Sequence, residues 1–354
     1  MVELEALKNI LQCRGREPTS RKITICDTVI ETNYIVLPRH ANPLGRVHGG
    51  QVIEWILDTA ALSGVKISRG PVVVASMDYM FFLNPVEVGD LFIVKSWIPF
   101  IGNTSLEVGI LAYTYSRRRV RITTFAHLAL VAVNDNLRPR PVPVKIRVEE
   151  EWEKELARRA VESRERRKPL IEGRRKAVSN LDPPEPLDRQ YVLRSYKIAM
   201  PEDMVYAHAL HAGRLLYWLD EVAGVLASSY ARGIVVTASV DATAFYHPIM
   251  PGDVIEMVAA ITYTGRKTVE VAIKTITENM LTRERKHTTT AYFTMVHIDL
   301  DGKTKELPPQ PSSINRQVLL EGEERRSRRN RILSELRRVK PILEREVEKM
   351  YQRT

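Results

Sequence analysis

The pattern of apolar and polar positions predicts one set of elements that occurs twice along the chain. In the first half, a short strand at Tyr34–Pro38 precedes a helix at Gln51–Ile67 that is apolar over most of its surface. A helix with so little polar face is buried on most sides. Four runs rich in β-branched and aromatic residues follow, at Val72–Phe82, Asp90–Phe100, Ser105–Arg117 and Arg119–Asn134. This order predicts an α+β fold in which an antiparallel sheet wraps around a central helix.

The second half repeats the first at a constant offset of 163 residues. It contains a strand-like run at Lys197–Pro201 and an apolar helix at Arg214–Ala231. Identical residues at this offset include the pairs His48 and His211, Gly50 and Gly213, Trp55 and Trp218, Asp78 and Asp241, and Glu107 and Glu270. A long repeat without gaps indicates two copies of one domain fused in tandem.

Proline-rich stretches and charge-dense segments set the expected boundaries. We predict a leader at residues 1–31, a first domain at 32–144, a charged helical linker at 145–190, a second domain at 191–309 and a charged C-terminal helix at 310–354. The linker helix is expected from Glu149 to about Lys168, and the last helix from about Glu321 to Gln352. Pro341 is expected to kink or break that last helix.

Charge and cysteine content exclude several functions. The net charge of +10 comes largely from helices in which acidic and basic residues alternate, which is typical of solvated helix faces and argues against nucleic-acid binding. A basic surface does suit a small ligand with several phosphates. Cys13 and Cys26 match no metal spacing and are predicted to be reduced thiols. No apolar run is long enough to span a membrane, so we expect a soluble, cytoplasmic protein.

Several segments resemble the hotdog-fold acyl-CoA thioesterases. They are the loop and turn His40–Gly50, the hairpin Gly102–Val108, the helix stretch Leu219–Gly224, and the run Val236–Asp241 with Phe245, Pro248 and Gly252-Asp253 after it. The tandem arrangement is similar to the double-hotdog cytosolic acyl-CoA hydrolases. The resemblance implies two hotdog domains, hydrolysis of acyl-CoA to a free fatty acid and coenzyme A, and a trimer of two-domain chains. It implies no separate cofactor, because coenzyme A is part of the substrate.

The resemblance also implies an asparagine on the loop of one domain and an acid on the helix of the other. The loop asparagine is Asn42, and its counterpart in the second copy is Val205. The helix acid is Asp220, and its counterpart in the first copy is Leu57. One crevice would therefore combine Asn42 with Asp220, whereas the other would have neither polar group. We predict a single working crevice between the two domains.

The roles of these residues leave alternatives open. Asp220 would act as general base or as nucleophile, and Asn42 would orient the water or the carbonyl unless it is only a turn residue. Gly49 and Gly50 begin a helix, so their N–H groups could form an oxyanion hole, or the glycines could simply permit a tight turn. His48 has a counterpart in both copies, which favours a structural or capping role. A Ser-His-Asp triad is disfavoured because no Gly-x-Ser-x-Gly pattern occurs.

Cations near hairpin turns are the candidates for binding the phosphates of coenzyme A. These are Arg118, between Arg117 and Arg119, together with Arg266 and Lys267. Two other functions remain open at this stage, namely a hotdog hydratase or dehydratase acting on acyl thioesters and a non-catalytic acyl-CoA-binding protein.

Overall fold

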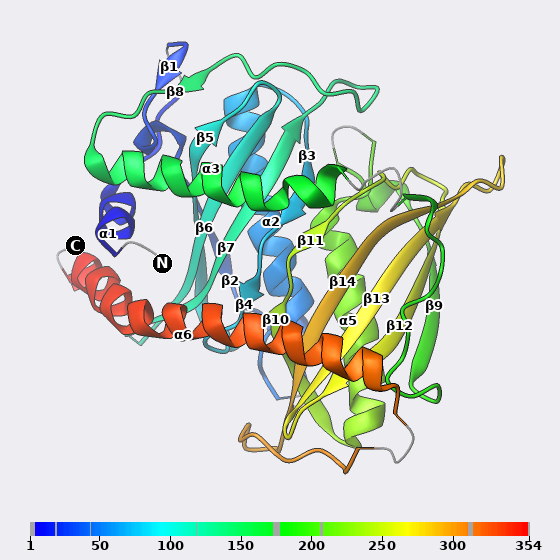
Figure 1. The fold of residues 1–354 in the computed structure, drawn as a ribbon. Helices are drawn as coiled ribbons and strands as arrows, with labels where there is room; N and C mark the ends of the chain where they lie inside the picture. Colours follow the sequence, from blue (N-terminus) through cyan, green and yellow to red (C-terminus); the bar gives the residue numbers. More distant parts are fainter. Residues whose placement is uncertain are drawn as a thin grey trace. The chain divides into compact units, whose positions relative to one another are not determined.

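The computed structural model describes residues 4–17, 20–42, 44–117, 119–172, 178–205, 208–310 and 314–352. The chain divides into two compact units. Unit 1 consists of Met1–Val47, Trp55–Pro169 and Ile332–Thr354, and unit 2 consists of His48–Glu54 and Leu170–Arg331. Figure 1 shows the order of helices and strands along the chain.

Unit 1 is built on an antiparallel sheet whose strands lie in the order β3-β7-β6-β5-β2. The strands are β2 (Ile30–Ile35), β3 (Val72–Met77), β5 (Leu91–Ile101), β6 (Ser105–Ser116) and β7 (Arg119–Ala132), with the short β4 (Met80–Phe81) after β3. Helix α2 (Gly49–Ser68) lies against one face, where its Thr59 Oγ1 is 2.6 Å from Thr32 Oγ1 of β2. Outside this sheet, β1 (Lys22–Ile23) pairs in parallel with β8 (Lys145–Ile146), and η1 (Cys26–Thr28) and η2 (Pro38–His40) are single 3-10 turns.

Unit 2 repeats this plan with strands in the order β10-β14-β13-β12-β9. They are β9 (Val192–Ile198), β10 (Ile234–Val240), β12 (Val254–Thr264), β13 (Thr268–Glu278) and β14 (Arg285–Ile298). The short η3 (Pro201–Asp203) and β11 (Thr243–Ala244) complete the unit, and helix α5 (Ala212–Ala231) packs on the sheet. The predicted α+β class, with an antiparallel sheet around a central helix, is confirmed in both copies.

Some element boundaries differ from the sequence prediction. Strands β2 and β9 end before Pro38 and Pro201, and each proline instead opens a 3-10 turn. Proline has no N–H to donate and fixes φ near −65°, so it cannot extend a strand ladder. The final helix, α6 (Arg316–Gln352), continues through Pro341, so the expected break is wrong.

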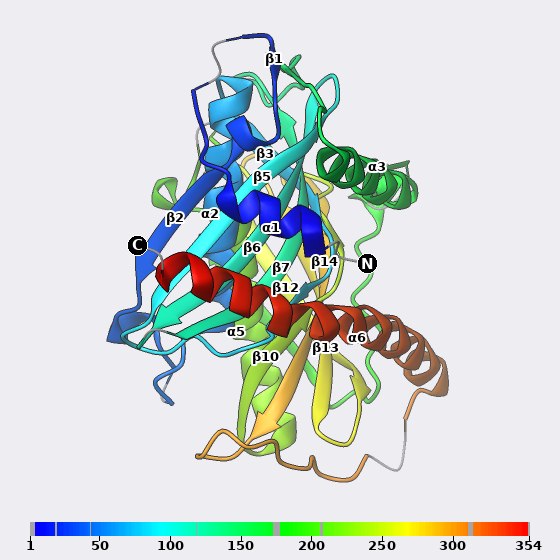
Figure 2. The same ribbon diagram turned by 90° about the vertical axis from the view of Figure 1, so that its left-hand side faces the viewer.

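The face of the unit-1 sheet that points away from α2 is covered by helices. These are α1 (Leu4–Gln12), α3 (Glu151–Glu172) and the part of α6 from Ile332 onward (Figure 2). Apolar side chains of α1 and α6, such as Ile10 and Leu343, pack in one buried cluster with Trp97 and Leu111 of the sheet. The charged helices are therefore amphipathic covers with an apolar inner side.

Each charged helix also contributes a buried arginine to a pair of carboxylates on its own sheet. In unit 1, Arg167 of α3 forms ion pairs with Glu107 and, at 2.8 Å, with Asp78. In unit 2, Arg329 of α6 lies 2.9 Å from Asp241 and 2.5 Å from Glu270. Burial raises the pKa of Glu107 to about 6 and that of Asp241 to about 7, although the arginines oppose both shifts.

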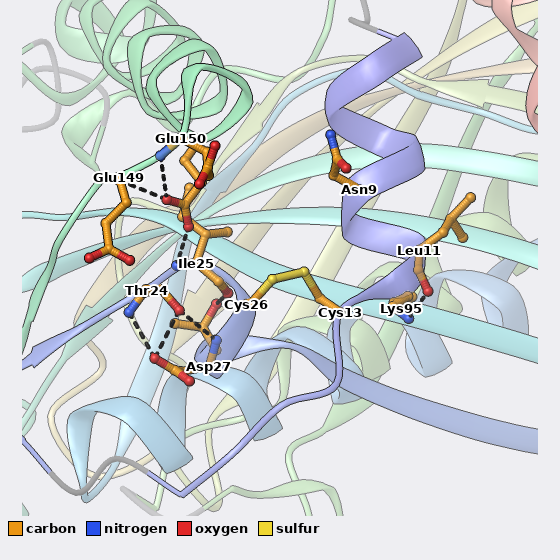
Figure 3. The surroundings of a disulfide bond; sticks show 12 residues. Asn9, Leu11, Cys13, Thr24, Ile25, Cys26, Asp27, Lys95, Glu149 and Glu150 are labelled. Atoms are coloured by element: carbon orange, nitrogen blue, oxygen red, sulfur yellow. Dashed lines mark hydrogen bonds between the residues drawn. A yellow bond between two sulfur atoms is a disulfide. The ribbon is translucent and has the colours of Figure 1, made fainter.

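A disulfide joins Cys13 to Cys26, so the predicted reduced thiols are a wrong expectation (Figure 3). Helix α1 ends at Gln12 and η1 begins at Cys26, which brings the two Cα atoms to 5.1 Å. Lys95 fixes the same region, because its Nζ donates to Leu11 O at the end of α1 at 2.9 Å. Because the two cysteines form a disulfide, they do not support the expected cytoplasmic location. Within the described ranges, no helix has the length and apolar character needed to cross a membrane.

Candidate active site

Asp220 is a fully enclosed carboxylate in the middle of α5, and only 1% of its surface is exposed. Its Oδ1 accepts a hydrogen bond of 2.6 Å from Thr237 Oγ1 of β10. Its Oδ2 accepts a hydrogen bond of 2.7 Å from the backbone N–H of Gly50 in the first turn of α2. All three residues belong to unit 2. The apolar residues around Asp220 bury this part of the helix. The two donors satisfy the carboxylate, which would otherwise be buried without hydrogen bonds.

The electrostatics of Asp220 combine two opposing effects. Burial raises the pKa of Asp220, because desolvation disfavours the charged form. The nearby His48, the Thr237 hydroxyl and the Gly50 N–H each lower it in return. The carboxylate also lies at the N-terminus of α2, where the helix dipole favours negative charge. A carboxyl group with a raised pKa that still has donors for its ionised form is suited to accept a proton.

His48 lies beside this carboxylate, a contact that the sequence did not predict. Its backbone carbonyl accepts the N–H groups of Gln51 and Val52, which is the capping role expected of it. Its ring also contributes, because Nε2 is 3.4 Å from Asp220 Oδ2 and the ring lies 5.2 Å from that of Tyr217. The counterpart His211 is the N-cap of α5, and burial lowers its pKa to about 4.

The two glycines of the turn are required by close packing. A Cβ on Gly49 would lie 2.5 Å from Thr237 Oγ1 and 2.9 Å from Asp220 Oδ2. A Cβ on Gly50 would lie 2.8 Å from Tyr217 Cα, a backbone atom that cannot move aside cheaply. The N–H of Gly50 is occupied by Asp220, whereas no interaction among the described residues uses the N–H of Gly49. The oxyanion role predicted for both glycines therefore suits Gly49 better.

Asn42 lies in unit 1, in the loop before α2. Its side-chain Oδ1 accepts the backbone N–H of Leu44 at 2.9 Å and of Arg46 at 3.3 Å. Its backbone N–H donates to Arg46 O at 2.7 Å. These contacts show the turn-forming role that the sequence left open, and the catalytic role of Asn42 stays a prediction.

The cation candidates for phosphate binding are only partly visible. Arg118 lies outside the described residues. Arg266 and Lys267 lie in the turn between β12 and β13, where Arg266 pairs with Glu306 at 3.6 Å and Lys267 Nζ donates to Thr304 at 2.8 Å. Their role toward coenzyme A stays a prediction. Within the described part of the chain, no group of three or more His, Cys, Asp or Glu side chains could hold a metal ion.

Thr237 is the site residue that the sequence analysis did not single out. The repeat contained the signal, because the counterpart of Thr237 at the 163-residue offset is Val74. Threonine thus occurs in the copy that has Asp220, and valine in the copy that has Leu57. The acid and its hydroxyl donor therefore come from the second copy, whereas the backbone donor Gly50 comes from the first.

Comparison with known proteins gives a consistent picture. The sequence profile of the thioesterase superfamily matches residues 44–120 and 207–283. Protein VdlD of Helicobacter pylori is 39% identical over 121 residues, which are 34% of this chain and 68% of that protein. The human cytosolic acyl coenzyme A thioester hydrolase is 26% identical over 294 residues, which cover 78% of this chain and 76% of that protein.

Among solved structures, a putative oleoyl thioesterase from Lactobacillus plantarum matches with a TM-score of 0.52 at 8% identity. The match covers 77% of this chain and 97% of that one, and it supports the tandem arrangement of the fold.

Proposed function

Because the chain belongs to the thioesterase superfamily, with two hotdog domains in tandem, we propose that it hydrolyses acyl-CoA thioesters to a free acid and coenzyme A. The human relative is named for this activity and matches along both copies. The observation that carries the proposal is the buried carboxylate of Asp220, held by Thr237 and by the N–H of Gly50 at the start of a helix.

The reaction needs one proton acceptor and one oxyanion site. Asp220 takes a proton from water as the oxygen attacks the thioester carbonyl, and the tetrahedral intermediate then expels the coenzyme A thiolate, which receives that proton. The same carboxylate could instead attack directly and form an anhydride that water then hydrolyses. The N–H of Gly49 is the donor we assign to the developing oxyanion, since Gly50 is already bound to Asp220.

Asn42 is proposed as the second polar group, contributed by the first copy. The support is the pattern of residues across the repeat. The combination of Asn42 with Asp220 and Thr237 is polar throughout, whereas its counterpart combination consists of Val205, Leu57 and Val74. We therefore propose one working crevice in each chain, with Arg266 and Lys267 as candidates to bind phosphates.

Self-association is a further part of the proposal. Strand β9 is an edge strand whose exposed side chains include Tyr196 and Ile198, at 60% and 57%, and Met200 just after the strand is 48% exposed. An exposed apolar edge strand is a ready surface for another copy. We propose a homo-oligomer, with a trimer as the form to test first, and a cytosolic location as in the name of the human relative.

The test is release of coenzyme A from a panel of acyl-CoAs of different chain length, followed by the free thiol. We expect Asp220→Asn to reduce turnover by roughly 100-fold or more, the usual scale for a positioned acid or base. The matched control is Glu221→Gln, one residue further along α5, which should retain most of the activity. Full activity in Asp220→Asn would refute the assignment, and hydration of an enoyl-CoA without thiol release would favour the hydratase alternative.

A further inference from the structure

A cleft of about 600 Å³ lies on the face of the unit-1 sheet that points away from α2. Its floor contains Trp97 of β5 and Gly109 of β6, which are partners in the strand register. Its walls come from three helices, through Leu7 of α1, Leu156, Ala160 and Ser163 of α3, and Ile332 and Leu336 of α6. Every one of these residues belongs to unit 1.

The strand alternation places this cleft on the face of the unit-1 sheet opposite α2. Ser96 contacts Ser63 of α2, so its neighbour Trp97 points to the opposite face of the sheet. Gly109 leaves room for the indole, since a Cβ there would lie 2.5 Å from the Trp97 ring. The cleft is thus a separate feature of the helix-covered side.

The second copy has larger side chains at two of the equivalent positions. Asp78 N donates to His127 O, and the counterpart Asp241 N donates to Tyr292 O, so His127 and Tyr292 are structural equivalents. Arg325 lies one helical turn before the buried Arg329, and its guanidinium is 4.5 Å from the Tyr292 ring centre. In the first copy, the residue one turn before the buried arginine is Ser163, and His127 replaces the tyrosine. Copy one therefore has smaller side chains at these two positions, which leaves more room at this end of the cleft.

One end of the cleft is polar and the rest is largely apolar. Burial lowers the pKa of His127 to about 4, so its ring is neutral at pH 7. The Asp78 carboxylate is already bound by Arg167 and Ser163. Arg166 lines the same end and donates to Ser163 Oγ at 3.0 Å, which leaves it further N–H donors for an anion. The opposite walls carry Trp97 and Phe125.

We propose that this cleft binds a free long-chain fatty acid, with its carboxylate beside Arg166 and its chain against Trp97 and Phe125. The volume lies in the usual range for small-molecule sites. Arg158 and Arg159 also line the cleft, but both form ion pairs with Glu155. Arg166 is therefore the cation that we assign to the carboxylate of an amphiphile. The inference rests on the proposed function, since a fatty acid is the product of that reaction. The chain would then sense its own product at a site outside the catalytic centre.

Quenching of tryptophan fluorescence by dibromostearate tests the position of the ligand. The chain has four tryptophans, of which Trp97 lines the cleft and Trp55, Trp152 and Trp218 do not. We expect saturable quenching in the wild-type protein and loss of most of it in Trp97→Phe. Equal quenching in both proteins, or none in either, would overturn the proposal.

The head group is tested with charge variants and an uncharged ligand. Arg166→Gln should weaken binding roughly tenfold, as expected for a lost charge-assisted contact. Arg328→Gln, the variant at the equivalent exposed position of α6, should bind normally. The methyl ester of the brominated acid should bind the wild-type protein about as weakly as the acid binds Arg166→Gln. If the ester binds as tightly as the acid, or both arginine variants bind alike, a carboxylate site is refuted.

A filling variant gives an independent result. His127→Tyr introduces the residue that the second copy has at the same place, and it should abolish quenching while the melting temperature shows a folded protein. Unaltered quenching in a folded His127→Tyr protein would contradict the proposal. The quenching assay requires no catalysis. A protein that releases no coenzyme A would therefore disprove the proposed function, whereas the quenching results alone would decide the binding proposal.

Discussion

The Thr237 hydroxyl makes a prediction that separates the proposed site from a purely structural carboxylate. Thr237→Val keeps the shape of the side chain and introduces the residue found at the counterpart, Val74. It removes a hydrogen bond of 2.6 Å to a carboxylate that is 1% exposed. Hydrogen bonds to charged groups are worth about 1.5–3 kcal/mol, which corresponds to about one to two pKa units. We therefore expect kcat/KM to fall by roughly 10- to 150-fold on the acidic limb, where less of the base is then ionised.

The pH profile gives the diagnostic readout. A base must be deprotonated, so activity falls as the pH drops through the pKa of Asp220. The Thr237 hydrogen bond lowers that pKa, and its loss should move the acidic limb of kcat/KM to higher pH. Thr237→Ser keeps the hydroxyl and should show neither effect. The assay is coenzyme A release from one acyl-CoA at a series of pH values from acidic to mildly alkaline. An unchanged acidic limb with full activity in Thr237→Val would refute the reasoning.

Three further predictions concern stability. Gly50→Ala should lower the free energy of unfolding by about 1–3 kcal/mol, because its Cβ would lie 2.8 Å from Tyr217 Cα. Thermal melting measures this, and an unchanged Tm would show that the turn can relax. Cys13→Ser should cost about 3 kcal/mol in urea unfolding, and dithiothreitol should destabilise the wild-type protein but not the variant. Arg329→Met should cost about 3–5 kcal/mol, most of it above pH 7, because the pKa of Asp241 is about 7 and its ionised carboxylate would lack the buried cation. A loss independent of pH would contradict that explanation.

The repeat made most of the fold predictable. Two copies of one pattern give two chances to recognise each element, and the central helices and long strands lie close to the predicted ranges. The errors fall where local chemistry is ambiguous. Pro38 and Pro201 were placed inside strands although each begins a 3-10 turn. The pairing of Cys13 with Cys26 depends on where α1 ends in space, which periodicity does not reveal.

The candidate site was predictable in its residues but less so in their contacts. Asp220 was identified through the resemblance to the hotdog-fold thioesterases, and its burial agrees with the apolar residues around it in the helix. The bond from Gly50 N–H to that carboxylate was not foreseen, since a sequence shows which N–H groups a helix start leaves open but not which acceptor occupies them. Thr237 was missed because a threonine in a strand is ordinary, and only its valine counterpart marks it as special.

The paired arginines of the charged helices bear on how the gene arose. Arg167 and Arg329 are 162 residues apart, one fewer than the sheet offset, and each neutralises the same two carboxylates of its own copy. The segment that was duplicated therefore already ended in a helix bound to its sheet by one arginine. On this interpretation, helix α3 between the two domains derives from the C-terminal helix of a single-domain ancestor. That helix packed on the sheet of the ancestor in the same way.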